Sequence, residues 1–250
     1  MIKKLAVLGS PIEHSKSPQI QLAALNSLGV EATFERVQVT NLGEFLSETR
    51  ESFDALSLTM PLKEQAVALA DWVDPLAEKV HAANYLIRNG NEWRAHNTDV
   101  FGIRKATEAV PAKTVGILGT GATARSALAA FDGKTILLWG RNATSAEELS
   151  HEFGASSANL SSVLSCDLVV STLPADALAT LAGATQPGVL LDVVYSRPSP
   201  SGFSEYISGL QMLVWQAIGQ LRILINGSEH PLDNEGELAR IMLRAAEVAE

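Results

Sequence analysis

Residues 115–127, VGILGTGATARSA, run from a stretch of aliphatic residues into a stretch rich in alanine. The first part is typical of a strand buried in a parallel sheet, and the second part is typical of a helix. Between them lies Gly119-x-Gly121-x-x-Ala124, the spacing of a dinucleotide-binding turn. Gly119 would permit the tight turn, Gly121 would let a pyrophosphate approach the backbone, and Ala124 would let the helix pack on the strand. The N–H groups of the helix start would bind the anion, although such a turn also occurs as a plain connection.

The same alternation of apolar runs and helical stretches extends in both directions from this turn. The Asn89-Gly90 pair between residues 83–88 and 92–97 is typical of a hairpin turn. Alternating strands and helices indicate an α/β fold with a parallel sheet and right-handed connections. Strands are expected over residues 3–9, 33–39, 54–59, 113–119, 134–140, 166–173 and 188–195. Helices are expected over residues 17–28, 60–73, 120–131, 144–153 and most of 209–250.

The chain is expected to contain two domains. A helix that ends at Pro111 would mark the boundary between two α/β halves. The C-terminal helices bring no strands of their own, so we expect them to pack on the first half and make that domain discontinuous. One domain would comprise residues 1–103 and 213–250, and the other would comprise residues 104–212.

Composition excludes several classes of protein. The chain has 250 residues, of which 46% are hydrophobic and 19% charged, so it can form a core and is not disordered throughout. The single cysteine, Cys166, excludes an internal disulfide, and neither it nor the histidines show metal-ligand spacing. No apolar run is long enough to span a membrane, and no signal-peptide cleavage site follows the first apolar run. We therefore expect a cytoplasmic protein that binds neither a metal nor a membrane.

Charge argues against nucleic acid as a partner. The net charge is −9, and the 19 lysines and arginines are scattered rather than gathered in a basic patch. An anionic small molecule would therefore depend on a few well-placed cations and N–H groups.

The end of the second strand after the glycine-rich turn bears on the choice of cofactor. An NAD site places an acidic residue there, which binds the ribose 2′-hydroxyl. This chain has Gly140-Arg141-Asn142 instead, so no carboxylate repels a 2′-phosphate and Arg141 can pair with one. The residues favour NADP over NAD, although Arg141 could also be a solvated loop cation.

Three polar motifs follow predicted strands of the first half, where α/β sheets present ligand-binding groups. They are GSPIEHSKSP (9–18), SLTMPLK (57–63) and HNTD (96–99). The hydroxyls of Ser15 and Ser17, which precede a helix, could hold a carboxylate.

Two charged residues of these motifs could carry the chemistry of a reaction. Pro61 would stiffen the loop that directs Lys63, although Lys63 could equally be a solvated residue at a helix start. Asp99 ends a polar run before a helix and could simply cap that helix.

Taken together, these motifs closely resemble the shikimate dehydrogenase family. Their order and spacing over the whole chain make chance agreement improbable. The motifs are GSPIEHSKSP (9–18), LTMPLK (58–63), AAN (82–84), NTDVFG (97–102), GILGTGATAR (116–125), DVVY (192–195) and GLQMLVWQA (209–217).

The resemblance implies an enzyme that reduces 3-dehydroshikimate to shikimate with NADPH, in aromatic amino-acid biosynthesis. It also implies a Rossmann-like NADP-binding domain (104–212) and a discontinuous α/β substrate-binding domain (1–103 and 213–250), with the active site in the cleft between them. By matching positions, the catalytic pair is Lys63 and Asp99. The substrate-binding residues are Ser15, Ser17, Thr59, Lys63, Asn84, Asp99, Tyr195 and Gln216. The cofactor-binding residues are Gly119, Thr120, Gly121, Ala122, Thr123, Arg141, Val193, Gly209 and Met212.

Reduction of a ketone needs such a pair of charged groups. Hydride transfer to the carbonyl carbon creates an alkoxide that must be stabilised and protonated. Lys63 would supply a cation and a proton near that oxygen, and Asp99 would orient the lysine and bind a neighbouring hydroxyl. Whether Lys63 acts as the acid or chiefly as an electrostatic stabiliser stays open.

The chain departs from the family at several positions. Gln21-Leu22 stands where the family usually has His-Asn, and Ser57 stands in place of Asn. His81 replaces a usual Gly, Tyr85 places a bulky ring beside Asn84, and Gly140-Arg141-Asn142 replaces Asn-Arg-Thr. None of the expected catalytic residues is lost.

Two other functions stay open. One is a quinate/shikimate dehydrogenase of the same fold that uses NAD. The other is a catalytically silent relative that binds nucleotide or a shikimate-like ligand as a sensor, against which the intact Lys63–Asp99 pair argues. The protein is expected to be a monomer or a homodimer.

Overall fold

The computed structural model describes residues 2–49, 52–174, 188–195 and 202–247. The chain forms two compact units, one of Met1–Thr98 with Leu213–Glu250 and one of Asp99–Met212. Within these described residues, each unit contains one six-stranded sheet. The domain division at 103/104 and 212/213 stays a prediction.

The sheet of the first unit has the strand order β2-β1-β3-β5-β6-β4. Its strands are β1 (Lys3–Gly9), β2 (Ala32–Gln38), β3 (Ala55–Leu58), β4 (Trp72–Val73), β5 (Tyr85–Asn89) and β6 (Glu92–His96). β1 runs parallel to both β2 and β3, whereas β5 is antiparallel to β3 and β6. The last residues of β1, β3 and β6 therefore lie at the same sheet edge as the first residue of β5.

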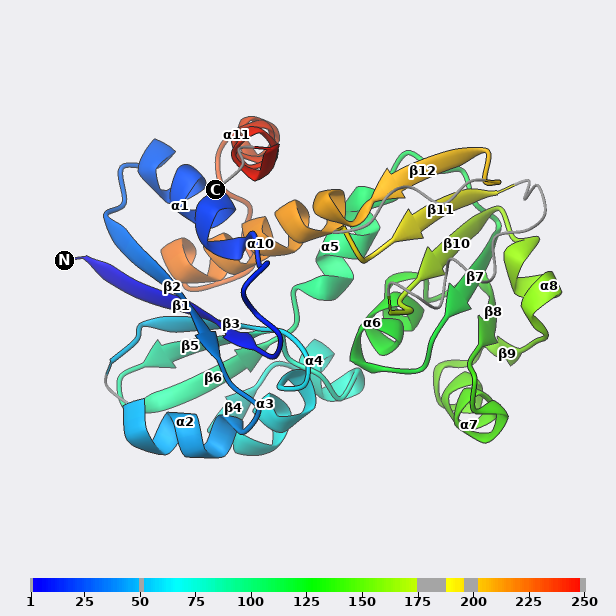
Figure 1. The fold of residues 1–250 in the computed structure, drawn as a ribbon, viewed down its shortest axis with the longest axis horizontal. Helices are drawn as coiled ribbons and strands as arrows, with labels where there is room; N and C mark the ends of the chain where they lie inside the picture. The colour runs from blue at the N-terminus through cyan, green and yellow to red at the C-terminus, as the bar shows by residue number, and fades with distance from the viewer. Residues whose placement is uncertain (1, 50–51, 175–187, 196–201, 248–250) are drawn as a thin grey trace. The chain divides into compact units, whose positions relative to one another are not determined.

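Helices cover both faces of this sheet. Figure 1 shows α2 (Leu42–Thr49), α3 (Lys63–Leu69) and α4 (Pro75–Lys79) on one face, opposite α1 (Ser17–Ser27) and α11 (Glu235–Glu247). A core of aliphatic side chains fills the first face, built from fully buried leucines of the strands and of the segments that lead into the helices. Those leucines are Leu8, Leu42, Leu56, Leu62 and Leu86. α10 (Gly209–Asn226) begins in the second unit and continues through the first.

The sheet of the second unit is parallel throughout, as the aliphatic runs predict. Its order is β12-β11-β10-β7-β8-β9, with β7 in an interior position (Figure 1). The strands are β7 (Thr114–Leu118), β8 (Thr135–Trp139), β9 (Ser156–Ser157), β10 (Leu168–Ser171), β11 (Val189–Asp192) and β12 (Glu205–Ser208). The helices among its described residues, besides the start of α10, are α5 (Asp99–Ala106), α6 (Ala122–Ala130), α7 (Ala143–Phe153) and α8 (Leu160–Leu164).

Two expected helices are shorter than the sequence suggests. The helix expected over residues 60–73 ends at Leu69, because Trp72–Val73 instead pair with β6 as an additional strand. The helix expected to reach Pro111 ends at Ala106, where the hydroxyl of Thr107 donates to the carbonyl of Ile103 and completes the last turn. The strands β4, β9 and β12, which were not expected, are short edge strands with little sequence pattern of their own.

No described helix is long and apolar enough to cross a membrane.

Candidate functional site

Backbone hydrogen bonds bring three of the polar segments together at one edge of the first sheet. The N–H of Ser10 donates to the carbonyl of Met60 at 2.9 Å, which links the loop after β1 to the loop after β3. The N–H of Leu58 donates to the carbonyl of Asn84 at 2.8 Å, and the N–H of Asn84 donates to the carbonyl of His96 at 3.1 Å. The motifs 9–18, 57–63 and 96–99 thus meet at one edge, although they are far apart in sequence.

The two serines lie where the loop after β1 turns into α1. Ser17 is buried and begins the helix, and its N–H donates to the hydroxyl oxygen of Ser15 at 3.4 Å. Arg36, on the neighbouring strand β2, donates from Nε to the backbone carbonyl of Ser15 at 2.8 Å. The loop therefore combines a hydroxyl pair, a helix start and a nearby guanidinium, a combination suited to a carboxylate. The sequence reasoning missed Arg36, because nothing in the strand pattern connects β2 with this loop.

The backbone of Leu8 and Gly9 at the end of β1 holds Thr59 in place. Its N–H donates to the carbonyl of Leu8 at 2.9 Å. A Cβ on Gly9 would lie 2.2 Å from the Cγ2 atom of Thr59 and 2.9 Å from the carbonyl oxygen of Met60. Gly9 is therefore required by the close approach of the threonine.

Lys63 is the first residue of α3 and is half-buried. Its carbonyl accepts a hydrogen bond from the N–H of Ala83 at 2.8 Å, so the helix start is fixed beside Asn84. Asp99 is buried, follows Thr98 directly and opens α5 in the second unit. The pairing of Lys63 with Asp99 stays a prediction.

Asn84, Thr98 and Gln216 form a buried cluster in the first unit. The Nδ2 atom of Asn84 donates to Oε1 of Gln216 at 2.9 Å and to Oγ1 of Thr98 at 3.0 Å. The Oδ1 atom of Asn84 accepts from the N–H of Thr98 at 2.7 Å. Asn84 thereby fixes the backbone immediately before Asp99. Two predicted substrate-binding residues, Asn84 and Gln216, are in direct contact, and Thr98 joins them as a residue that the sequence reasoning missed.

The glycine-rich turn of the second unit has the backbone that its sequence predicts. Gly119 has a φ of +113°, and a Cβ there would lie 2.3 Å from Oγ1 of Thr172. Gly121 is the N-cap of α6, and no atom lies within 4 Å of the position of its absent Cβ. Gly121 supplies no side-chain cap, and Ala122 and Thr123 are the first two residues of the helix. This geometry fits a bound pyrophosphate.

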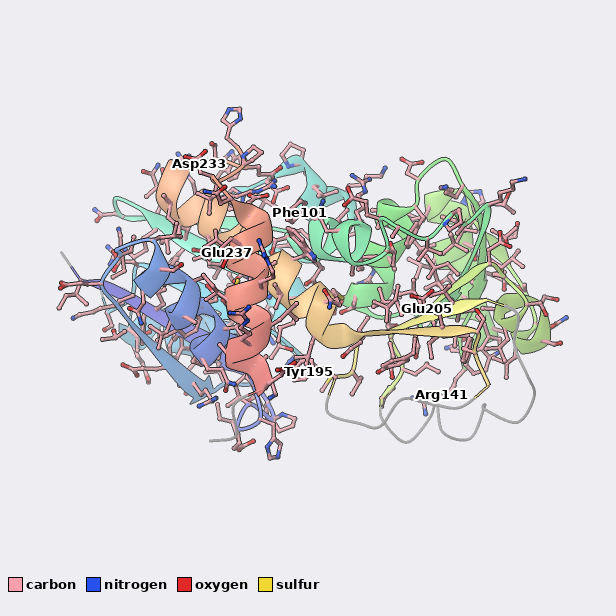
Figure 2. The ribbon with its side chains drawn as sticks, turned by 90° about the horizontal axis from the view of Figure 1, so that it is seen from above. Phe101, Arg141, Tyr195, Glu205, Asp233 and Glu237 are labelled. Atoms are coloured by element: carbon pink, nitrogen blue, oxygen red, sulfur yellow. The ribbon has the colours of Figure 1, made fainter. Side chains whose placement is uncertain are left out.

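Arg141 follows β8 and is exposed. Figure 2 shows its side chain extending away from the ribbon of the second unit. Gly140 lies against the turn, because a Cβ on it would approach Cγ2 of Thr120 to 2.6 Å. The end of β8 and the glycine-rich turn are therefore adjacent, so one ligand could reach both Thr120 and Arg141.

The remaining predicted residues of the second unit follow β11 or open α10. A Cβ on Gly209 would lie 2.5 Å from the carbonyl oxygen of Val193, so glycine is needed where α10 starts against the end of β11. Met212 is buried one turn further along α10, and Tyr195 is half-buried two residues after Val193 (Figure 2). The structure thus brings Val193 and Gly209 into contact.

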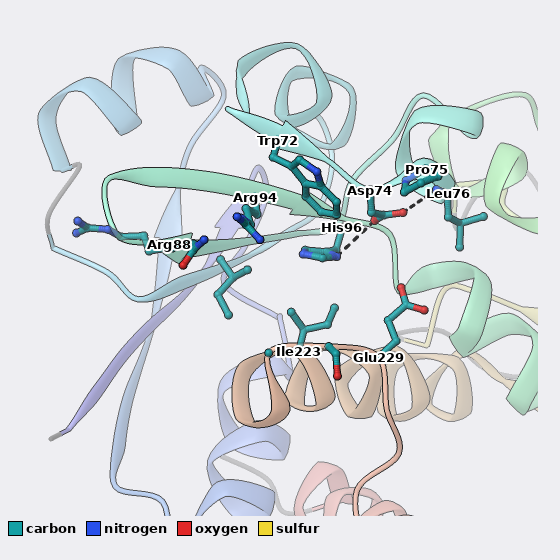
Figure 3. A pocket seen from close by; sticks show the side chains of 13 residues that line it. Trp72, Asp74, Pro75, Leu76, Arg88, Arg94, His96, Ile223 and Glu229 are labelled. Carbon is teal, nitrogen blue, oxygen red and sulfur yellow. Dashed lines mark hydrogen bonds and ion pairs between the residues drawn. The ribbon is translucent and has the colours of Figure 1, made fainter.

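A separate cavity of about 550 Å³ lies in the first unit, and none of the predicted site residues lines it. In Figure 3, Trp72, Arg94 and His96 lie on one wall, and Ile223 and Glu229 lie opposite. The full lining is Trp72, Asp74, Pro75, Leu76, Ile87, Arg88, Asn89, Arg94, His96, Ile223, Gly227, Ser228 and Glu229.

Asp74, one of the residues that line this cavity, already has a role in the fold. Asp74 caps α4 by accepting from the N–H groups of Leu76 and Ala77, and it also accepts from the N–H of Asn97 at 2.8 Å. Burial lowers the pKa of His96, although Asp74, 3.6 Å from its Nδ1 atom, opposes this shift. The cavity therefore has a lining of its own, although His96 belongs to both the cavity and the motif 96–99 of the sheet edge.

Comparison with known proteins identifies the family. Residues 7–86 match the family described as the shikimate dehydrogenase substrate binding domain. A curated shikimate dehydrogenase (NADP(+)) of Thermus thermophilus is 32% identical in an alignment 247 residues long. The alignment covers 88% of this chain and 91% of that protein. This chain belongs to the shikimate dehydrogenase family. The shikimate dehydrogenase (NADP(+)) of Ignicoccus hospitalis is 31% identical in an alignment 251 residues long, which covers 90% of this chain and 94% of that protein.

Solved shikimate dehydrogenases have the same fold. The enzyme of a second Thermus thermophilus strain, solved in complex with NADP(H) and shikimate, matches with a TM-score of 0.82 and 29% identity over 97% of this chain and 99% of that one. The Mycobacterium tuberculosis enzyme matches with a TM-score of 0.85 and 33% identity over 98% of both chains. The family and the α/β fold class predicted from the sequence are confirmed.

The departures from the shikimate dehydrogenase pattern have distinct structural settings. His81 has a φ of +50°, the left-handed conformation that a glycine would adopt without strain. Tyr85 is buried, and burial together with the nearby charge of Asp54 raises the pKa of its hydroxyl, so it stays neutral. Ser57 and Gln21 are also buried and are in contact, since Nε2 of Gln21 lies 3.3 Å from Oγ of Ser57.

Gln220 is a further buried residue that the sequence reasoning missed. It lies one helical turn after Gln216 on α10 and donates to Oε1 of Gln216 at 2.8 Å. The spacing of four residues between two glutamines in an apolar helix is the signal that could have found it.

Proposed function

We propose that this protein catalyses the reversible NADP-dependent reduction of 3-dehydroshikimate to shikimate, a step of aromatic amino-acid biosynthesis. The observation that carries the proposal is the gathering of the family's polar motifs at one sheet edge, in a chain that belongs to the shikimate dehydrogenase family. The Thermus thermophilus relative that matches with a TM-score of 0.82 was solved with NADP(H) and shikimate.

The substrate would be held mainly by hydroxyl and amide groups of the first unit. Ser15 and Ser17 would bind its carboxylate, with the start of α1 and Arg36 adding positive potential. Thr59 and the amides of Asn84 and Gln216 would contact its hydroxyls, and Tyr195 would also be a substrate-binding residue. An acidic chain with a net charge of −9 can bind this anion only through such local donors.

NADP would bind along the edge of the second sheet. Gly119, Thr120, Gly121, Ala122 and Thr123 would hold the pyrophosphate at the start of α6. Arg141, which stands where an NAD enzyme has a carboxylate, would pair with the 2′-phosphate. Val193, Gly209 and Met212 would border the nicotinamide. Gly209 allows the start of α10 to lie against the backbone of Val193, because it has no Cβ.

The bound NADPH supplies the hydride. Hydride arrival at the carbonyl carbon leaves negative charge on the carbonyl oxygen, and Lys63 would stabilise that charge and provide the proton. Asp99 would orient the ammonium group and accept a hydrogen bond from a neighbouring hydroxyl of the substrate. In the direction of oxidation, the same lysine would accept the hydroxyl proton.

Steady-state kinetics with shikimate and with quinate, each with NADP⁺ and with NAD⁺, test this function. We expect the highest kcat/KM for shikimate with NADP⁺. A preference for quinate with NAD⁺ would instead support the quinate/shikimate dehydrogenase. Binding of NADPH without turnover of either substrate would identify a catalytically silent relative.

The proposal extends to the setting of the enzyme. We place it in the cytoplasm as a monomer or homodimer, with small molecules rather than nucleic acid or membranes as partners. Sedimentation of the purified protein would decide the oligomeric state.

A further inference from the structure

We propose that Gln220 is a positioning residue, which acts with Gln21 and Ser57 to fix the amide of Gln216 so that it presents a hydrogen-bond donor to the substrate. This inference rests on the proposed function, because it assigns a role to the surroundings of the same site. It also gives one explanation for two departures from the family pattern, Gln21 and Ser57.

Every polar atom of the Gln220 side chain is used inside the first unit. Its Oε1 atom accepts from Oγ of Ser57 at 2.7 Å and from Nε2 of Gln21 at 2.8 Å. Its Nε2 atom donates to Oε1 of Gln216 at 2.8 Å and to the carbonyl of Asn84 at 3.3 Å. Gln220 is only 1% exposed, so water does not substitute for these partners.

The donors on one side of Gln220 determine which way its amide faces. The Nε2 atom of Gln21 donates to both Ser57 and Gln220, so an inverted Gln220 would set one NH₂ group against another. With the oxygen held toward Gln21 and Ser57, the NH₂ group must face Gln216. The amide of Gln21 on α1 and the hydroxyl of Ser57 on β3 thus determine how the amide of Gln220 on α10 is oriented.

The amide of Gln216 is oriented in turn by its hydrogen bond from Gln220. Its Oε1 atom accepts from Nε2 of Gln220 at 2.8 Å and from Nδ2 of Asn84 at 2.9 Å, which occupies both lone pairs of the oxygen. Its Nε2 atom donates one hydrogen to the carbonyl of Leu213 at 2.9 Å. Among the residues that the structure describes, none accepts the second hydrogen. Gln216 therefore offers a ligand an N–H donor rather than an acceptor.

The lengths of the three supporting side chains are matched. Ser57 is short, so the longer side chain of Gln21 can reach both the Ser57 hydroxyl and the Gln220 amide. A larger residue at 57 would compete with Gln21 for the space beside Gln220. The two differences from the family pattern, Gln21 and Ser57, therefore form one coupled change that holds Gln220 in place.

A double-mutant cycle tests the role of Gln220. In the wild-type background, Gln220→Leu should raise KM for shikimate about tenfold, the factor for one net hydrogen bond of about 1.4 kcal/mol, with KM for NADP⁺ unchanged. In the Gln216→Leu background, the same substitution should have little further effect, since Gln220 acts through Gln216. Gln19→Leu is the matched control, because it removes an amide hydrogen bond from α1 to the carbonyl of Ala245 without touching the cluster.

A second variant gives a readout that loss of stability alone would not produce. The carboxyl of Gln220→Glu can still donate to Gln216 when protonated but cannot when ionised. KM for shikimate in this variant should therefore be close to the wild-type value at low pH and rise as the pH increases, beyond any rise in the wild type. This variant also serves if Gln220→Leu does not fold.

The outcomes separate the two proposals. Absence of shikimate turnover in the wild type would overturn the proposed function. Normal wild-type turnover with additive effects of the 216 and 220 substitutions, or a flat pH profile of KM for Gln220→Glu, would overturn the positioning role alone. Non-additive effects together with the pH-dependent KM support it.

Discussion

The glycine-rich turn of the second unit and the sheet edge of the first unit are built by different means. The turn comes from one continuous stretch, and its geometry is set by backbone conformation, as in the φ of +113° at Gly119. The sheet edge is assembled from separate segments that include Ser15, Thr59 and Gln216, and buried side-chain hydrogen bonds hold it.

This difference determines how each region should respond to substitution. In the turn, the effect of an added methyl group depends on the space beside that residue and on its φ, which differ between Gly119 and Gly121. At the sheet edge, loss of one donor or acceptor leaves other buried groups unsatisfied, so effects are coupled. Four sets of substitutions, taken from the largest expected effect to the smallest, test this contrast.

Lys63→Ala should reduce kcat by about two to four orders of magnitude, the usual range for a proton-transfer group. Thermal unfolding should change little, because Lys63 is half-buried at the first position of a short helix. Lys79→Ala, at an exposed position on α4, is the control for loss of a lysine. Turnover of Lys63→Ala near that of the control would remove the lysine from the mechanism.

Gly119→Ala and Gly121→Ala should separate the two demands on the turn. At Gly119 the added Cβ would lie 2.3 Å from Thr172 in a left-handed backbone, so stability should fall by about 1–3 kcal/mol. At Gly121 the Cβ has open space, so stability should hold while KM for NADP⁺ rises about tenfold or more, a loss of at least about 1.4 kcal/mol of binding. Chemical denaturation and cofactor kinetics on both variants measure this. Equal stability of the two would contradict the assignment of strain to Gly119.

Arg141→Ala should weaken NADP⁺ binding about ten- to a hundredfold, the range for a charge-assisted hydrogen bond of about 1.5–3 kcal/mol. Binding of NAD⁺, which lacks the 2′-phosphate, should change much less. Titration of both cofactors against wild type and variant measures the difference, and equal weakening would contradict the pairing with the 2′-phosphate.

The contrast also explains how much the sequence could predict. The parallel strands, the turn and its glycines were predictable because aliphatic runs and φ-demanding positions are local properties. The resemblance to the family pointed to Ser15, Lys63 and Gln216 as site residues. The contacts among Asn84, Thr98 and Gln216 could not be predicted, because only the fold brings their segments together.

Some features had weaker signals. Strand β4 was missed because Trp72 and Val73 continue an apolar pattern that also suits a helix, and only their pairing with β6 decides between the two. Gln21 and Ser57 differ from the family pattern at positions 36 residues apart, and only the fold shows that their side chains are hydrogen-bonded to each other. The four-residue spacing of Gln216 and Gln220 is the one local signal of this network, whereas its contacts with Gln21 and Ser57 join segments that only the fold brings together.

His81→Gly should have the smallest effect, and it should be stabilising. His81 has a φ of +50°, a conformation that costs an L-residue roughly 1–2 kcal/mol and glycine almost nothing. Glycine also loses more entropy on folding and forfeits the contacts of the imidazole, so the expected net gain is about 1 kcal/mol, or about 2–4 °C in Tm. Asn234→Gly is the control, since Asn234 has a φ of 57° but asparagine tolerates this region better. A backbone-determined position should respond in this way without any change in KM for shikimate. A rise in that KM would show instead that His81 belongs with the coupled side chains of the sheet edge.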